Sequence, residues 1–481
     1  MKQQKLLVIG NGMVGHKAVE LLATQSQYQL QVLGREPRPA YDRVHLSSFF
    51  SGLGASELSL VDDDFYRSHG IEVSMSCNVR QIDRESKTVL TEEGHEYAYD
   101  KLILATGSVP FVPPVPGRDQ PHCHVYRTIE DLLAIQDSAL QSRVGVVIGG
   151  GLLGLEAAKA LHDLGLTAHV VEFAPQLMAV QLDAEGGALL REKIEALDVG
   201  VHTGKNTLEI IAGTQQRYRM NFADDTYLET DMIVFSAGIR PQDDLARQAG
   251  LTIGERGGIV INEFCQTSDP DIYAIGECAL RNGRIFGLVA PGYEMARVAV
   301  AHLNGRTDSC FNGADMSTRL KLLGVDVAAI GDAHGRTPDC CCLSWLDQEN
   351  QNYQKVVLSP DRKRLLGAVL VGDTKDYDQW LPLMMNQMEL SDPPEYMILP
   401  EAFRQSSAFD INSLSDDTWV CRCNRVNKGD IRDAIQNGCT DLGSITHATG
   451  AASTCGSCAS LVRQILQSET VAMEASLIQT D

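Results

Sequence analysis

The stretch KLLVIGNGMVGHKAVELL, residues 5–22, decides the fold of this chain. Its apolar run leads into glycines with G-x-G-x-x-G spacing, and a helical pattern follows from Val14 to about Thr24. The next apolar run, Leu30–Gly34, completes the order strand, glycine turn, helix, strand. In such a unit the glycines admit a dinucleotide pyrophosphate, and the helix N-terminus offers it N–H groups. The stretch therefore predicts a Rossmann-like dinucleotide-binding domain.

The same order recurs at residues 144–172. A strand at Val144–Gly149 enters a second glycine turn, a helix runs to about Leu164, and a strand ends at Glu172. An acidic residue at this strand end takes the adenosine ribose hydroxyls and repels a 2′-phosphate, so we expect NADH rather than NADPH. The alternative reading of Glu172 is a solvated strand end.

Other short strands end in residues typical of nucleotide domains. Period-two alternation predicts strands over 71–104 and 218–236, which end near Ala105-Thr106-Gly107 and Gly238. The stretch 267–277, TSDPDIYAIGE, resembles the second FAD motif of two-dinucleotide-domain flavoprotein reductases, which have Asp where this chain has Glu277. A helix predicted to begin at Pro291-Gly292 would direct its positive end at a flavin.

The stretch near the first helix lacks redox cysteines. Disulfide reductases of this fold carry a Cys pair there and single-Cys peroxide reductases carry one Cys, but this chain has Ser51 at that place. Serine cannot cycle through a sulfenate or a disulfide, so electrons on a flavin would need another exit.

Four cysteines near the C-terminus offer that exit: Cys421, Cys423, Cys455 and Cys458. Two close pairs can converge on one iron–sulfur or zinc centre. A CxC first pair is unusual for a zinc ribbon, and the stretches CRCN and TCGSC resemble the bacterioferritin-associated ferredoxin-like module, which binds [2Fe-2S]. Three adjacent cysteines, Cys340–Cys342, cannot all bind one ion comfortably and are expected to pack in a strand or loop.

Composition limits the class of protein. The 481 residues allow several domains, and the net charge of −22 argues against nucleic acid and suits docking on a basic partner surface, with solubility as the alternative. No apolar run approaches the ~20 residues of a membrane span. Without an export signal, the thirteen cysteines indicate a cytoplasmic protein with reduced thiols.

Several stretches together resemble one family of electron-transfer proteins. They are GNGMVGH (10–16), AYDRVHLSSFFSG (40–52), IYAIGECA (272–279), LVAPGYEMA (288–296) and LKLLGVDVAAIGDAHGRTP (320–338), followed by the cysteine module. They are similar to the N-terminal half of the NADH-dependent nitrite reductase large subunit and to the free-standing electron-transfer subunit of bacterial assimilatory nitrate reductase.

The resemblance implies electron flow from NADH to FAD to [2Fe-2S] and on to a partner, the molybdenum-containing catalytic subunit of nitrate reductase. Nitrite reductase chains continue into a sirohaem half beyond this length, which favours the free-standing subunit. The alternatives are the electron-input part of an NADH-dependent nitrite reductase, acting on a sirohaem chain, and a zinc-stabilised flavoprotein redox sensor.

The expected site residues follow from the motifs and the resemblance. A cation at Arg43 can meet the pyrophosphate. By resemblance Glu156 orients the nicotinamide carboxamide. Family members often have an acid where this chain has Arg35, so the contact with the FAD ribose is assigned to Glu36, with Arg35 as the alternative. The expected FAD contacts are Gly10, Gly12, Met13, Val14, Gly15, Glu36, Arg43, Val79, Ala105, Thr106, Gly107, Gly276, Glu277, Pro291 and Gly292. The expected NADH contacts are Gly149, Gly151, Leu152, Leu153, Gly154, Glu156, Glu172 and Gly238.

The predicted fold class is α/β, with two Rossmann-like domains of the pyridine nucleotide-disulfide reductase type. A small α+β domain and a small helical [2Fe-2S] domain follow. The predicted boundaries are 1–118 and 243–308 for FAD, 119–242 for NADH, 309–400 for the α+β interface domain, 401–417 for a linker, 418–468 for the cluster domain and 469–481 for a tail.

Overall fold

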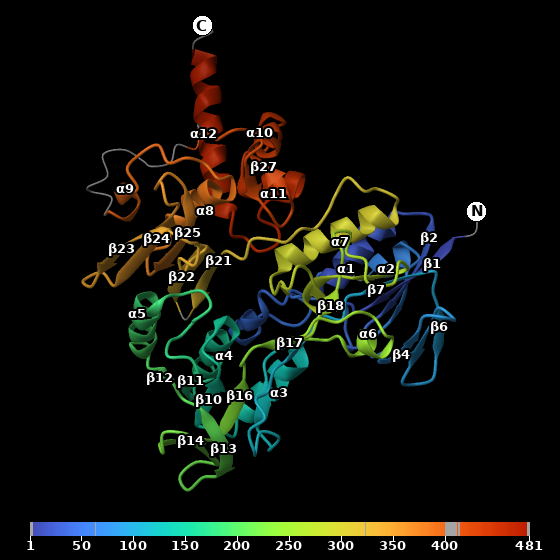
Figure 1. The fold of residues 1–481 in the computed structure, drawn as a ribbon, viewed down its shortest axis with the longest axis horizontal. Coiled ribbons are helices and arrows are strands. Elements are labelled where there is room, and N and C mark those ends of the chain that lie inside the picture. The colour runs from blue at the N-terminus through green and yellow to red at the C-terminus, as the bar shows by residue number, and fades with distance from the viewer. Residues whose placement is uncertain (1–2, 63, 323, 400–410, 412–413, 479–481) are drawn as a thin grey trace. The chain divides into compact units, whose positions relative to one another are not determined.

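The computed structural model describes residues 3–62, 64–322, 324–399, 411 and 414–478. The chain divides into two compact units (Figure 1). Unit 1 is formed by residues 1–111, 125–134 and 238–314, and unit 2 by residues 112–124, 135–237 and 315–481. None of the helices in the described ranges is both long and apolar enough to cross a membrane.

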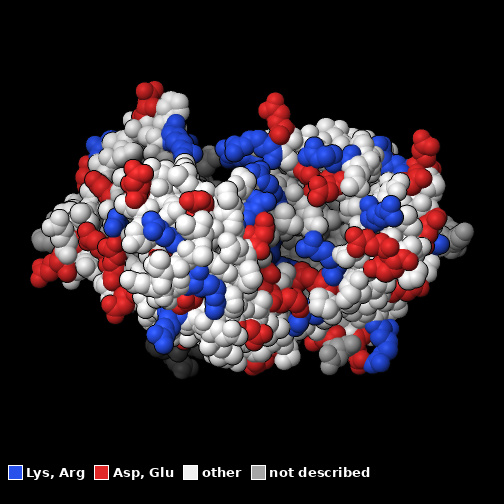
Figure 2. Space-filling model, turned by 90° about the horizontal axis from the view of Figure 1, so that it is seen from below, with Lys and Arg blue, Asp and Glu red and all other residues white. Residues whose placement is uncertain are grey.

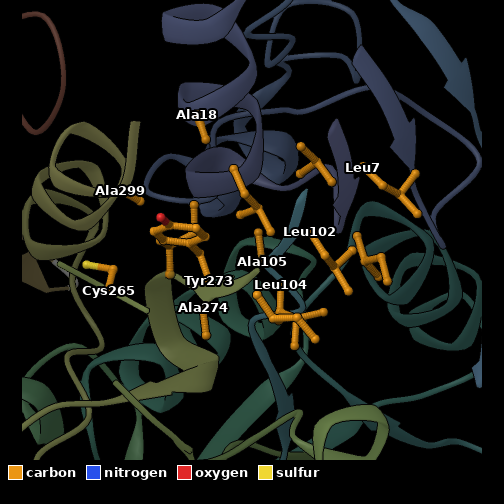
Figure 3. Packing of buried hydrophobic residues seen from close by; sticks show 14 of the residues in the cluster. Leu7, Ala18, Leu102, Leu104, Ala105, Cys265, Tyr273, Ala274 and Ala299 are labelled. Carbon is orange, nitrogen blue, oxygen red and sulfur yellow. The ribbon is translucent and has the colours of Figure 1, made fainter. Parts of the chain in front are cut away.

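A parallel five-stranded sheet lies at the centre of unit 1, in the order β19-β7-β1-β2-β3. Its strands are β1 (Gln4–Ile9), β2 (Tyr28–Leu33), β3 (Glu72–Ser74), β7 (Lys101–Leu104) and β19 (Ile272–Ala274). The apolar run Leu6–Ile9 is buried throughout, as expected for a parallel strand covered on both faces. Figure 3 shows Leu7, Leu102, Leu104 and Tyr273 in this core.

Helices α1 (Met13–Ala23) and α7 (Val289–Leu303) pack against each other beside this sheet. The short helices of unit 1 are α2 (Phe65–Ser68), α6 (Asp244–Gln248) and the 3₁₀ turns η1 (Leu46–Ser51) and η2 (Gly276–Cys278). Its smaller sheets consist of β4 (Val79–Asp83), β5 (Thr88–Thr91) and β6 (Glu96–Ala98), of β8 (Ser108–Pro110) with β17 (Ile239–Pro241), and of β18 (Ile259–Val260) with β20 (Ala279–Leu280).

Unit 2 contains a second five-stranded sheet around β10, in the order β12-β11-β10-β16-β9, in which β12, β11, β10 and β16 are parallel. The strands are β9 (Cys123–Val125), β10 (Val144–Ile148), β11 (Thr167–Val171), β12 (Gly200–His202) and β16 (Met232–Phe235). The other elements of this region are α3 (Ile129–Ala139), which begins in unit 1, α4 (Leu152–Asp163), α5 (Ala184–Glu195) and the antiparallel β13 (Thr207–Ala212), β14 (Tyr218–Phe222) and β15 (Tyr227–Thr230).

An antiparallel five-stranded sheet follows in unit 2, in the order β21-β22-β25-β24-β23. It is formed by β21 (Thr318–Leu322), β22 (Val325–Gly331), β23 (Cys341–Asp347), β24 (Asn352–Leu358) and β25 (Leu365–Val371), with α8 (Tyr377–Met385) and α9 (Glu395–Ile398). Helix α5 packs on β24 and β25. At the helix N-cap, Asp183 accepts hydrogen bonds from Tyr353 Oη at 2.8 Å and Lys355 Nζ at 2.9 Å.

The C-terminal part of unit 2 is a small, mostly helical module. It contains β26 (Trp419–Cys421), β27 (Val426–Asn427), α10 (Lys428–Gln436), α11 (Leu442–Thr449) and α12 (Ala459–Ile478). Helix α12 continues through most of the residues expected to be a tail, because residues 468–478 contain no Gly or Pro that would end it. Most of the predicted linker, at 401–410 and 412–413, lies outside the described residues.

Candidate cofactor and cluster sites

The first glycine turn joins β1 to α1 with its backbone tightly folded. A β-carbon on Gly10 would lie 2.2 Å from the Ala105 carbonyl oxygen, and one on Gly15 would lie 2.0 Å from the Gly10 carbonyl oxygen. Nothing lies within 4 Å of a β-carbon on Gly12, which is the N-cap of α1. The outer glycines therefore allow close packing, while the middle one leaves space at a helix N-terminus, which fits a pyrophosphate.

Three distant segments meet at Val14, behind this turn. A β-carbon on Gly276 would lie 3.3 Å from Val14, and one on Gly292 would lie 2.5 Å from its Cγ2. Helix α7 begins at Val289 rather than at Pro291, so Pro291 and Gly292 form its first turn. The glycine turn, the second motif and the α7 N-terminus are thus brought together as the sequence predicted.

Glu277 is held by two residues that sequence reasoning missed. Its carboxylate accepts hydrogen bonds from Arg127 Nη2 and from Ser108 Oγ, both at 2.6 Å. Arg127 also donates to Ser108 Oγ at 2.7 Å. These hydrogen bonds fix the orientation of the Glu277 carboxylate. No local motif marks Arg127, which lies 150 positions from Glu277 in the sequence.

Glu36 and Arg43, predicted to contact the FAD ribose and pyrophosphate, form an ion pair with each other. Tyr41 donates to Glu36 at 2.6 Å, and the Arg43 guanidinium lies 4.8 Å from the centre of the Tyr41 ring. Arg43 Nη1 donates to the Arg127 carbonyl at 3.0 Å. Burial raises the pKa of Tyr41, so its hydroxyl stays a donor.

The remaining predicted FAD residues lie on the same unit. Ala105 N donates to Ile9 O at 2.8 Å, Thr106 Oγ1 donates to Gln242 O at 2.6 Å, and Gly107 has a φ of +70°. Met13 is the first residue of α1, and Val79 is the first of β4. Ser51 ends η1, and its equivalence to the nucleophilic cysteine of other family members stays a prediction.

The second glycine turn repeats the geometry of the first between β10 and α4. A β-carbon on Gly149 would lie 2.2 Å from Ser236 O, and one on Gly154 would lie 1.9 Å from Gly149 O. Nothing lies within 4 Å of a β-carbon on Gly151, the N-cap of α4. This turn therefore fits a second dinucleotide.

Glu172 follows β11, and its carboxylate folds over this turn. It accepts hydrogen bonds from the backbone amides of Gly150 and, at 2.6 Å, Ala174. Leu152 and Leu153 open α4, which also carries Glu156. Gly238 lies in unit 1, where Phe111 N donates to its carbonyl at 2.9 Å. The cofactor contacts of these residues stay a prediction.

The four predicted ligand cysteines gather in the C-terminal module. The thiols of Cys423 and Cys455 lie 3.2 Å apart, and Cys421 contacts both Cys423 and Cys458. Cys421, Cys423 and Cys458 are buried, and Cys455 is exposed. The sulfurs form a chain, Cys458–Cys421–Cys423–Cys455, and the described residues contain no set of three His, Cys, Asp or Glu side chains placed to hold a single ion.

Asn424 connects the two loops that carry these cysteines. Its amide nitrogen donates to Gly450 O at 2.6 Å, Ser453 Oγ at 2.8 Å and Thr454 Oγ1 at 3.1 Å. Its position directly after the CxC pair is the sequence feature that could have indicated this connecting role.

The proton affinities of the four thiols alternate along the chain of sulfurs. Hydrogen bonds from Cys423 and Cys458 lower the pKa of Cys421, and a hydrogen bond from Cys423 lowers that of Cys455. The pKa values of Cys423 and Cys458 are raised, first by their contact with Cys421. Four thiolates together in this space require positive charge between them, which iron supplies, so the donor set fits a [2Fe-2S] cluster.

Family models match three parts of the chain. Residues 4–302 match the pyridine nucleotide-disulphide oxidoreductase model, residues 317–388 the rubredoxin NAD⁺ reductase C-terminal domain, and residues 419–468 the BFD-like [2Fe-2S] binding domain. FAD and NADH are the cofactors of the first family, and the last domain binds a [2Fe-2S] cluster.

Curated relatives match nearly the whole chain. It is 52% identical over 474 residues to the nitrite reductase (NADH) large subunit of Escherichia coli, covering 98% of this chain and 56% of that protein. It is 54% identical to the nitrite reductase [NAD(P)H] large subunit of Klebsiella oxytoca, covering 97% and 49%. It is 36% identical to the assimilatory nitrate reductase electron transfer subunit of Bacillus subtilis, covering 97% and 60%. The chain thus spans about half the length of the curated relatives it matches.

Solved structures share the fold. The NAD-dependent persulfide reductase of A. fulgidus has a TM-score of 0.73 at 25% identity, covering 80% of this chain and 77% of that one. Putidaredoxin reductase, in its covalent complex with putidaredoxin, has a TM-score of 0.73 at 23% identity, covering 84% and 97%. The predicted fold class, cofactors and family resemblance are confirmed, and the chain belongs to the pyridine nucleotide-disulphide oxidoreductase family and ends in a BFD-like [2Fe-2S] binding domain.

Proposed function

We propose that this chain is an NADH-driven electron-transfer unit that delivers single electrons to a partner reductase. The observation that carries the proposal is the group of four cysteine thiols in a chain that also has two dinucleotide turns. FAD, when bound, accepts a hydride from NADH and releases electrons one at a time. With serine at position 51, the chain offers no thiol at the usual place beside the flavin.

The chain's own residues have three tasks in this function. The open middle glycine of each turn, Gly12 and Gly151, admits a pyrophosphate at a helix N-terminus. Glu277, fixed by Arg127, presents a carboxylate to a ribityl hydroxyl. Glu172 presents a carboxylate to the NADH ribose and disfavours the 2′-phosphate of NADPH.

Cys455 marks the side on which electrons leave. It is the exposed cysteine of the four, while Cys421, Cys423 and Cys458 are buried. A partner that approaches the Cys455 side comes closest to the cluster. On the face shown in Figure 2, Lys and Arg are interspersed with Asp and Glu, so the net charge of −22 does not form one acidic patch there.

Replacement of one ligand tests the proposed order of electron flow. In Cys423→Ser we expect the iron content and cluster absorption to fall while NADH still bleaches the flavin, and reduction of a one-electron acceptor to stop. Cys439→Ser, at a half-buried cysteine of the same module, is the matched control and should behave like the parent. Loss of flavin reduction in Cys423→Ser would show that the order is wrong, and zinc without iron in the parent would favour the redox-sensor alternative.

The proposed partner is the molybdenum-containing catalytic subunit of nitrate reductase, since the relative from B. subtilis is named as its electron transfer subunit. A sirohaem nitrite reductase chain is the second candidate, because identity is higher to the nitrite reductase large subunits of E. coli and K. oxytoca. Each purified partner is mixed with this chain and NADH. Nitrite formed from nitrate supports the first candidate, and ammonium formed from nitrite supports the second.

A further inference from the structure

A tight turn ahead of β23 brings two thiols together, away from the cluster cysteines. The Asp332 carboxylate accepts backbone hydrogen bonds from Arg336 at 2.9 Å and Thr337 at 2.7 Å, which close the turn around Gly335. Gly335 has a φ of +67°, in the left-handed region that favours glycine. A β-carbon there would lie 2.9 Å from Cys342 Sγ and 3.4 Å from Cys340 Sγ. Both sulfurs therefore converge over one α-carbon.

The two thiols are in direct contact. Cys340 and Cys342 are hydrogen-bonded to each other, and Cys340 Sγ also donates to Gly335 O at 3.4 Å. Because side chains alternate along an extended segment, Cys340 and Cys342 share one side and Cys341 takes the other. The packing role expected from the sequence does not explain such a pair, since Cys342 is exposed and Cys340 only half-buried.

The surroundings admit a small reagent. β23 is an edge strand of its sheet, and Ser344, Trp345 and Leu346 beyond the pair are exposed. Partial desolvation of its sulfur raises the pKa of Cys342, the nearby Lys355 ammonium opposes that rise, and the contact with Cys340 adds to it.

We propose that Cys340 and Cys342 form a reversible intrachain disulfide by exchange with a low-molecular-weight disulfide. The exposed Cys342 sulfur first loses its proton, then attacks one sulfur of the reagent and releases one small thiol, giving a mixed disulfide. Cys340 then loses its proton and displaces the second small thiol. The protein gives up two protons and two electrons, and the reagent is reduced to two thiols. Residues two apart are near the upper span for a disulfide, and Cys341 between them is the first residue of the extended strand β23, so closing the bond requires the backbone at Cys341 to bend.

Maleimide mapping of the intact holoprotein tests this site. Anaerobic protein is exposed to oxidised glutathione, blocked with N-ethylmaleimide and digested with trypsin, which releases residues 337–355 with all three cysteines. In the parent we expect this peptide to lose two of its three maleimide additions and to be two hydrogens lighter. The reduced parent should carry three additions. The peptide containing Cys310, an exposed cysteine, is the control and should not lose two hydrogens.

Single serine variants identify the pair. Cys341→Ser should still close the disulfide and carry no maleimide after oxidation. Cys340→Ser and Cys342→Ser should form no intrachain disulfide, and the cysteines left in their peptides should carry maleimide or bound glutathione. The proposal is wrong if oxidised Cys341→Ser keeps two maleimides, or if Cys340→Ser forms a Cys341–Cys342 disulfide as readily as the parent closes. Unchanged flavin and cluster spectra show that each variant is folded.

Discussion

Two alanine substitutions in the second glycine turn should affect different properties, one the stability of the protein and the other its affinity for NADH. Gly154→Ala places a methyl group 1.9 Å from Gly149 O and 2.8 Å from Gly149 C, both backbone atoms that no rotamer change can move. Helix α4 must therefore shift away from β10, and its buried Leu155 and Leu161 move with it. Overpacking of this kind costs roughly 1–3 kcal/mol.

Gly151→Ala places its methyl group where nothing lies within 4 Å, at a φ of −83° that alanine adopts readily. We expect the stability to change by less than about 1 kcal/mol. The methyl group points into the space assigned to the NADH pyrophosphate, so NADH should bind about tenfold more weakly, which corresponds to ~1.4 kcal/mol.

Calorimetry and NADH titration of the flavin-loaded protein separate the two effects. The melting transition of unit 2 should fall by roughly 3–10 °C in Gly154→Ala and stay near the parent value in Gly151→Ala. NADH affinity should fall in Gly151→Ala with the flavin content unchanged. The reasoning is refuted if Gly151→Ala binds NADH as tightly as the parent, or if Gly154→Ala has the same melting temperature as the parent.

Three other substitutions probe the loops that carry the cluster cysteines, the partner of the Glu277 carboxylate and the N-cap of α5. Asn424→Ala removes three hydrogen bonds between the cysteine loops and should lower the iron retained after desalting, while Asn437→Ala, exposed at the end of α10, should not. Arg127→Met leaves the Glu277 carboxylate without its guanidinium and should weaken FAD retention about tenfold or more, measured by flavin release on dilution. Although burial alone would raise the pKa of Asp183, hydrogen bonds from a lysine, a tyrosine and a backbone amide hold it below its ordinary value. Its stabilisation is therefore complete above about pH 4 and is lost as the pH falls through the folded-state pKa, so urea midpoints of the parent and Asp183→Asn should converge in acid; a gap that persists there would contradict the assignment.

Local motifs made much of the fold predictable. The glycines at 10–15 and 149–154 stand between an apolar run and a helical pattern, and both turns have the predicted strand–turn–helix form. The largely apolar stretch Val325–Gly331, in which Asp326 is the charged residue, forms strand β22. For Cys340–Cys342 a strand or a loop was expected, and the bounds of β23 were not predicted, since the mixed exposure of this edge strand leaves no clear alternation.

Sequence reasoning found some long-range associations and missed others. The two close cysteine pairs predict one shared centre, and the four thiols lie close together in the structure. The ion pair of Arg127 with Glu277 leaves no such trace, because neither residue belongs to a motif shared with the other. The pairing of Glu36 with Arg43 was likewise missed, although both were singled out separately.

The interrupted course of unit 1 along the chain has a consequence for biosynthesis. Strand β19 joins the sheet beside β7, and Ser108 and Glu277, which share a hydrogen bond, lie 169 positions apart. A ribosome must therefore make the whole second glycine-turn region before the first sheet can be completed. Since Gly276, Glu277 and Gly292 all emerge after that point, we expect a nascent chain released before about residue 300 to lack a finished flavin site. Flavin loading then becomes a late event in the synthesis of the chain.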